Sequence, residues 1–150
     1  MEGTLNADMS ASARIQDFEY LYASNTNVSN FVSVKLSGNN NYHVWKSQML
    51  CLLDSNNMGG IVDAKFVGPR YYGTDRGRQY DSLARGWILG SLSEDVIADV
   101  HNLGSAKAVW EKLKRIYDPA LCLKEGTFFL VHPKLHFIFI SLFHQLQIVS

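Results

Sequence analysis

The stretch SAKAVWEKLKRIYDP, residues 105–119, decides the fold class of this chain. Ser105 is a typical helix N-cap residue, and Asp118, as the residue before Pro119, avoids the helical region of backbone space. Between them the apolar side chains recur at steps of three and four, which places them on one face of an α-helix; they are Val109, Trp110, Leu113, Ile116 and Tyr117. The pattern predicts an amphipathic helix between Ser105 and Asp118.

Three further helical patterns precede this one. The first follows an asparagine cap at residues 39–41 and is stopped by two glycines at 59–60, and its apolar face is Tyr42, Trp45, Met49, Leu52 and Leu53. The second follows a loop at 61–77, and its face is Tyr80, Leu83, Ala84, Trp87 and Ile88. The third is short, begins after Ser93, and carries Val96, Ile97 and Val100. We therefore interpret residues 31–118 as an all-α domain, a small bundle of about four helices.

The regions on either side differ in composition. Residues 1–30 are rich in Ser, Asn, Ala and Asp, so we expect a mostly disordered leader, in which 18–22 form a short apolar patch. Residues 31–36 alternate loosely and predict an extended arm. Residues 119–150 form an atypical hydrophobic tail whose pattern fits a helix or a strand equally well.

Charge and cysteine content exclude several classes of protein. The 150 residues contain 14 basic and 14 acidic side chains, so the net charge is zero, which excludes a strongly basic protein that binds nucleic acid by charge alone. Two cysteines are too few for a disulfide-dense scaffold or a four-cysteine zinc site. The first twenty residues have no apolar core typical of a secretory signal, so we expect a cytoplasmic protein.

The sequence predicts no catalytic, cofactor-binding or metal-binding residues. It contains no G-x-S-x-G, phosphate-binding glycine loop or H-E-x-x-H motif, and Cys51 among leucines is expected to be a buried hydrophobe. His132, His136 and His144 have no acidic partner nearby, so we expect no zinc site.

Two other features bear on membranes. The apolar run at 137–143 is too short to cross a bilayer, so a tail-anchored membrane protein is the less favoured alternative. Gly86 and Gly90 predict close packing between helices beside Trp87, because the flanking residues are those of a soluble helix.

A second candidate function is nucleic-acid contact through the central loop. Cationic and aromatic side chains alternate there, a combination that suits stacking on bases and pairing with phosphates; the candidates are Arg70, Tyr71, Tyr72, Arg76 and Arg78. Asp75 and Asp81 offset part of this charge, and a solvated loop is the simpler interpretation.

Three ordered blocks resemble one known family. Residues 31–50 contain FVSVKLSG and NYHVWKSQML, residues 86–96 are GWILGSLSEDV, and residues 106–113 are AKAVWEKL. Together they resemble the N-terminal part of plant copia-type retrotransposon Gag polypeptides. The resemblance implies a capsid-like, non-catalytic helical domain that associates with itself or with related Gag chains around RNA. It also implies a signature of core residues; in this sequence they are Tyr42, Trp45, Trp87, Trp110 and Leu113.

The chain departs from that family after Pro119. The polar helices expected next and a C-x-x-C-x-x-x-x-H zinc knuckle are both missing from residues 120–150. We therefore expect a truncated relic of a Gag-like protein that lacks the zinc knuckle by which the family usually binds RNA.

Overall fold

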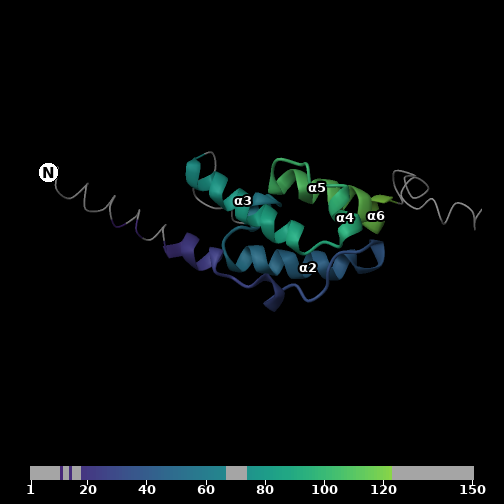
Figure 1. The fold of residues 1–150 in the computed structure, drawn as a ribbon, viewed down its shortest axis with the longest axis horizontal. Coiled ribbons are helices and arrows are strands. Elements are labelled where there is room, and N and C mark those ends of the chain that lie inside the picture. The colour runs from purple at the N-terminus through teal and green to yellow at the C-terminus, as the bar shows by residue number, and fades with distance from the viewer. Residues whose placement is uncertain (1–10, 12–13, 15–17, 67–73, 123–150) are drawn as a thin grey trace, which may run out of the picture.

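In the computed structural model of the chain, residues 11, 14, 18–66 and 74–122 are described (Figure 1). Their named elements are α2 (Asn39–Ser55), α3 (Asp75–Gly90), α4 (Glu94–Ala98), α5 (Ala106–Tyr117), α6 (Pro119–Cys122) and the 3-10 helices η1 (Val28–Asn30) and η2 (Gly59–Ile61). The β-structure in these ranges is limited to a single bridge between Leu36 and Leu92. The all-α prediction is therefore confirmed.

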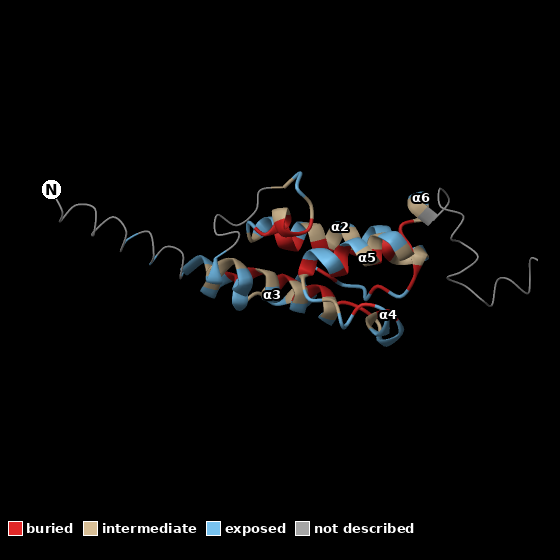
Figure 2. Ribbon diagram, turned by 90° about the horizontal axis from the view of Figure 1, so that it is seen from above, coloured by how far each residue is buried: buried red, intermediate tan, exposed pale blue. Residues whose placement is uncertain are grey.

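The core lies where α2, α3 and α5 face one another (Figure 2). Trp45 of α2 packs against Trp110 of α5, with ring centroids 5.5 Å apart. The Trp45 Nε1–H donates a hydrogen bond of 2.9 Å to Ser91 Oγ, just beyond the end of α3. A buried indole N–H needs such a partner, so this bond joins two helices through the centre of the core.

The ends of the helices follow local chemistry in most places. The Ser105 side chain accepts a hydrogen bond from the Ala108 N–H, and α5 ends at Tyr117, as expected. Ser93 occupies the N-cap position of α4, although its side chain makes no capping bond. The helix α2 ends at Ser55, before the two glycines, because Asn57 adopts a left-handed conformation with φ of 55°.

The asparagine cap expected for α2 is wrong. Gly38 is the N-cap residue, and no side chain caps the helix. Asn41 instead donates through Nδ2 to the Lys35 carbonyl at 2.8 Å, and its Oδ1 accepts from the Ser37 N–H at 3.1 Å. The Asn41 side chain thus fastens residues 31–38, which we call the arm, to the first turn of α2.

The arm is also held at Leu36, which is fully buried. The Leu36 N–H donates to the Ser91 carbonyl at 3.0 Å, and the Ser93 N–H donates to the Leu36 carbonyl at 2.9 Å. These two bonds connect the arm with the turn between α3 and α4. The extended arm therefore packs on the bundle as part of its core.

Part of the leader, which is predicted to be mostly disordered, has a defined structure. Residues 18–24 are helical, and Ala23 is buried. Tyr20 meets Tyr80 of α3 edge to face, with ring centroids 5.4 Å apart. A contact with α3, distant in sequence, thus orders a segment whose own composition favours disorder. The rest of the leader up to residue 17, apart from 11 and 14, and the tail from residue 123 lie outside the described residues, so the predicted domain boundaries stay predictions.

Two expectations about packing are also wrong. Cys51 is exposed, because it lies on the outer side of α2. A Cβ atom added at Gly86 or Gly90 would meet nothing within 4 Å, so these glycines make no close contact between helices. Both predictions are wrong for the same reason. A helical repeat places residues on one face of a helix, but it does not show which faces pack against another element.

Gly59, in contrast, lies in a tight place. A Cβ atom at this position would be 2.7 Å from Cβ of Phe66. Gly59→Ala is therefore expected to lower the free energy of unfolding by about 1–3 kcal/mol, because the turn after α2 must shift to make room. Urea denaturation followed by circular dichroism measures the change. Gly104→Ala is the control, since a Cβ at Gly104 meets nothing within 4 Å, and an equal loss in both variants would contradict this account.

Candidate interaction surface

The structure describes two of the five residues predicted to contact nucleic acid. Arg70, Tyr71 and Tyr72 lie outside the described residues, while Arg76 and Arg78 lie in the first turns of α3. The loop expected at 61–77 is therefore shorter, because Thr74 caps a helix that begins at Asp75.

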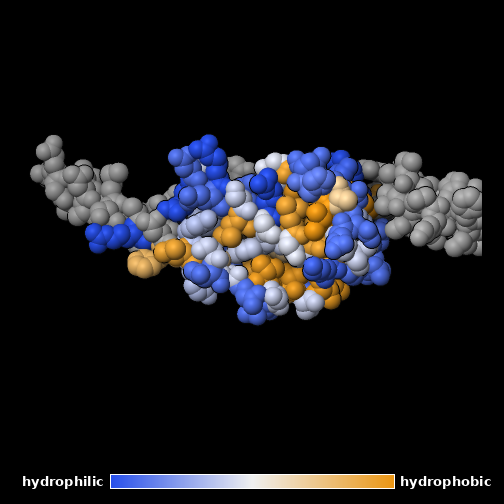
Figure 3. Space-filling model, viewed as in Figure 1, coloured by the Kyte–Doolittle hydropathy of each residue, from blue (hydrophilic) through white to orange (hydrophobic). Residues whose placement is uncertain are grey.

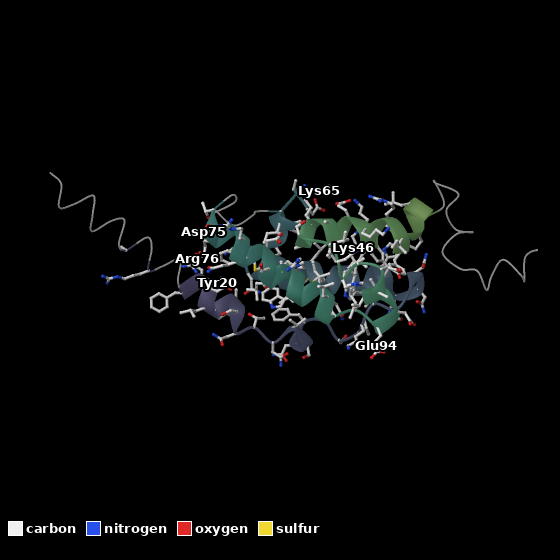
Figure 4. All side chains as sticks on the ribbon, turned by 45° about the horizontal axis from the view of Figure 1, so that its top comes forward. Tyr20, Lys46, Lys65, Asp75, Arg76 and Glu94 are labelled. Carbon is white, nitrogen blue, oxygen red and sulfur yellow. The ribbon has the colours of Figure 1, made fainter. Side chains whose placement is uncertain are left out.

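Both described arginines are engaged by neighbouring side chains. The Arg76 guanidinium lies 5.3 Å from the centre of the Tyr20 ring, and it also donates to Gln79 Oε1 at 2.9 Å (Figure 4). Arg78 forms an ion pair with Asp75. A phosphate would have to compete with these local contacts, which weakens the case for this loop as an electrostatic binding site.

The five signature residues are all buried. Tyr42, Trp45, Trp87, Trp110 and Leu113 belong to the hydrophobic core. They act as packing anchors of the bundle, and of the five only Trp87 also lines a hollow in the described residues.

Four large apolar side chains are exposed around one hollow, and we call them the aromatic patch. They are Phe18, Leu21, Tyr22 and Phe31, with exposed fractions of 71%, 54%, 76% and 40%. The hollow has a volume of about 670 Å³. Figure 3 shows hydrophobic side chains at the left end of the coloured surface, where Figure 1 draws the purple helix at 18–24. Single exposed apolar residues are ordinary, but a cluster around a concavity is typical of an interaction site.

Side-chain hydrogen bonds hold the walls of this hollow. The Asn25 Nδ2 donates to the Leu21 carbonyl at 2.7 Å and closes the helix at 18–24. The Thr26 hydroxyl lies 3.4 Å from Asn56 Oδ1, at the end of α2. The Asn27 side chain accepts from the Ser29 N–H at 3.1 Å and begins η1. Three separate elements therefore present the aromatic patch on a defined scaffold.

The described residues that line the hollow carry no charge. Its remaining lining residues are uncharged and polar; they are Asn25, Thr26, Asn27, Asn30, Ser55 and Asn56. Such a lining does not attract phosphates or metal ions, and it suits a neutral partner with apolar side chains. The apolar residues at 18–22 are recognisable in the sequence. Their polar neighbours favour disorder, so the sequence did not predict that they form an exposed patch.

Perturbed pKa values do not indicate chemistry at this surface. Burial, with Asp118 and then Glu111 nearby, raises the pKa of Tyr42, while burial and the carboxylate of Asp99 raise that of Tyr117 to about 12. Both tyrosines belong to the packed core, away from the aromatic patch. In the described ranges, no group of three or more His, Cys, Asp or Glu side chains is placed to hold a metal ion.

Membrane-spanning character is likewise missing from the described helices. No helix in residues 18–66 or 74–122 is both long enough and apolar enough to cross a bilayer.

Comparisons with known proteins point to retrotransposons. The chain is 31% identical over 104 residues to the retrovirus-related Pol polyprotein from transposon RE2 of Arabidopsis thaliana, and 29% identical over 104 residues to that from transposon RE1. It is 25% identical over 112 residues to the polyprotein from transposon TNT 1-94 of Nicotiana tabacum. These matches cover 62–65% of this chain but only 7–8% of the relatives' lengths.

Two other comparisons returned nothing. No family model matches the chain, and no solved structure matches it.

The chain is distantly similar, over almost two thirds of its length, to plant copia-type retrotransposon Pol polyproteins.

Proposed function

We propose that this chain is a Gag-like, capsid-type domain of a plant retrotransposon. In this proposal it is not an enzyme, and it associates with copies of itself or with related Gag chains. The aromatic patch is the observation that carries the proposal, because Phe18, Leu21, Tyr22 and Phe31 are exposed together around an uncharged hollow. The distant similarity to retrotransposon polyproteins supports a relation to such elements.

The chemistry of the patch favours a protein partner. Aromatic residues are enriched, and charged residues depleted, at the centres of protein interfaces. The polar residues around the hollow provide amide and hydroxyl groups for hydrogen bonds at the rim, as in ordinary interfaces. Identical chains meeting through the same patch would bury the rings of both partners in a closed, two-fold contact.

Self-association is expected to depend on the patch. The double variant Phe18→Ser and Tyr22→Ser should weaken the dimerisation constant by about tenfold or more, because buried aromatic anchors carry much of the energy of an interface. Sedimentation velocity over a range of protein concentrations measures the constant.

Val44→Ser provides the matched control, since Val44 is exposed on α2 and lies outside the patch. A wild-type chain that stays monomeric at high concentration would refute the proposal, and so would an equal effect of the control variant.

The same preparations test the RNA alternative. We expect filter binding across a salt series to detect no electrostatic binding of RNA. Such binding would fall steeply with salt and would be reduced by Arg76→Gln and Arg78→Gln. Binding of that kind would assign the function to residues 70–80.

A further inference from the structure

A second hollow lies between the arm and α3, and we call it the arm groove. Its volume is about 310 Å³. Val28, Val32 and Val34 line one side, and Gly86, Trp87 and Gly90 line the other. Among the described residues that line it, Lys35 is the one that carries a charge. The groove therefore suits a neutral, apolar occupant.

Two features of the arm groove allow it to bind an apolar segment. The glycines leave space, since a Cβ atom at Gly86 or Gly90 meets nothing within 4 Å. The arm also offers one backbone donor on this side, because within the described residues the Val34 N–H has no hydrogen-bond partner. Lys35 faces the other way, since its carbonyl accepts from Asn41 of α2. An extended segment in the groove could pack side chains against the glycine backbone and accept a hydrogen bond from the Val34 N–H.

The described part of the chain ends near the end of the molecule where the arm joins α2. Asp118, which precedes α6, lies 3.6 Å from Lys46 in α2. Lys46 is seven residues from the start of α2, roughly 10 Å along the helix, and the arm ends where α2 begins. Figure 1 shows α6 at the same end of the molecule as the start of α2.

The length of chain after α6 suffices to reach the groove. Residues 123–136 can span roughly 45 Å when extended, which exceeds the radius of a domain of this size about threefold. The next residues, 137–143, have the sequence FIFISLF, which has no charge and only one polar side chain. This run matches the apolar, nearly uncharged lining of the arm groove.

We propose that residues 137–143 occupy the arm groove of their own chain, as an extended segment beside the arm. The segment covers Val34 and the glycines of α3, and it supplies an acceptor for the Val34 N–H. The hydrophobic tail is then a part of the domain, packed on a surface different from the aromatic patch.

Hydrogen–deuterium exchange on the full 150-residue chain tests this placement. We expect the amides of residues 137–143, together with that of Val34, to exchange about tenfold or more slowly than in an unstructured chain. Gly86→Leu fills the groove and should return both groups of amides to fast exchange. Gly104→Leu is the matched control, because it adds the same side chain where a Cβ meets nothing within 4 Å but lies outside the groove lining.

A second variant keeps the test independent of changes in α3. Ile138→Asp with Ile140→Asp places charges in the tail segment and should likewise remove the protection of Val34. Exchange of residues 137–143 at the unstructured rate in the wild-type chain would overturn the proposal. Protection that survives both the groove and the tail variants would also overturn it, as would protection that grows with protein concentration, which would indicate a second copy in the groove.

Discussion

Trp45→Ala is expected to lower the free energy of unfolding by about 3–5 kcal/mol. The Trp45 side chain is fully buried, packs against Trp110, and donates its N–H to Ser91. Truncation leaves a cavity where α2 meets α5 and removes the donor to Ser91 Oγ, a buried hydroxyl that itself donates to the Ile88 carbonyl at 2.7 Å. A domain of this size has a total stability of roughly 5–15 kcal/mol, so the variant is expected to lose much of its folded population on mild heating.

Urea denaturation followed by circular dichroism measures this effect. The matched control is Val44→Ala, one residue earlier on α2, where the side chain is 54% exposed. We expect that change to stay within about 0.5 kcal/mol. Similar losses at the two positions would mean that α2 does not pack with the face assigned to it.

Alkaline pH is expected to destabilise the fold through its buried tyrosines. Burial, followed by the charge of Asp99, which also accepts a hydrogen bond from the Tyr117 hydroxyl at 3.5 Å, raises the pKa of Tyr117 from 10 to about 12. The folded chain thus retains this proton at pH values where the unfolded chain releases it. The resulting stability is fully present below pH 10 and is lost as the pH rises towards 12, by about 2 kcal/mol at pH 12.

Tyr42 adds to this loss, because burial, with a smaller effect of Asp118, raises its pKa in the same direction. Urea midpoints between pH 9 and 12, with phenolate absorbance recorded in parallel, measure the dependence. Tyr117→Phe is the informative variant, since its stability should fall less between pH 10 and 12 than that of the wild-type chain. An unchanged pH profile in this variant would show that Tyr117 is not the group responsible.

Most of the helical core was predictable from the residues. The spacing of Val109, Trp110 and Leu113 places them on one face of α5, and all three are buried. The end of this helix at Asp118 follows from Pro119, a strictly local effect. Helix faces and helix ends are predictable because the helical repeat, capping residues and proline all act within a few residues along the chain.

The surfaces were less predictable for a physical reason. Cys51 lies in the same helix as buried leucines and is nevertheless exposed. Gly86 and Gly90 resemble a packing motif, yet they face an open groove. In each case the outcome depends on which other element covers that side, and this information is spread over the whole chain.

The amino-acid sequence by itself determined the all-α class, the approximate positions of the main helices and the aromatic anchors of the core. The tertiary structure decided the order of residues 18–24, through the contact of Tyr20 with Tyr80, and with it the aromatic patch. It also decided that the arm is held by Asn41 and by the Leu36–Leu92 bridge, which leaves a groove beside α3. Local patterns determine where a helix forms, whereas contacts between distant segments determine which of its faces remain available to a partner.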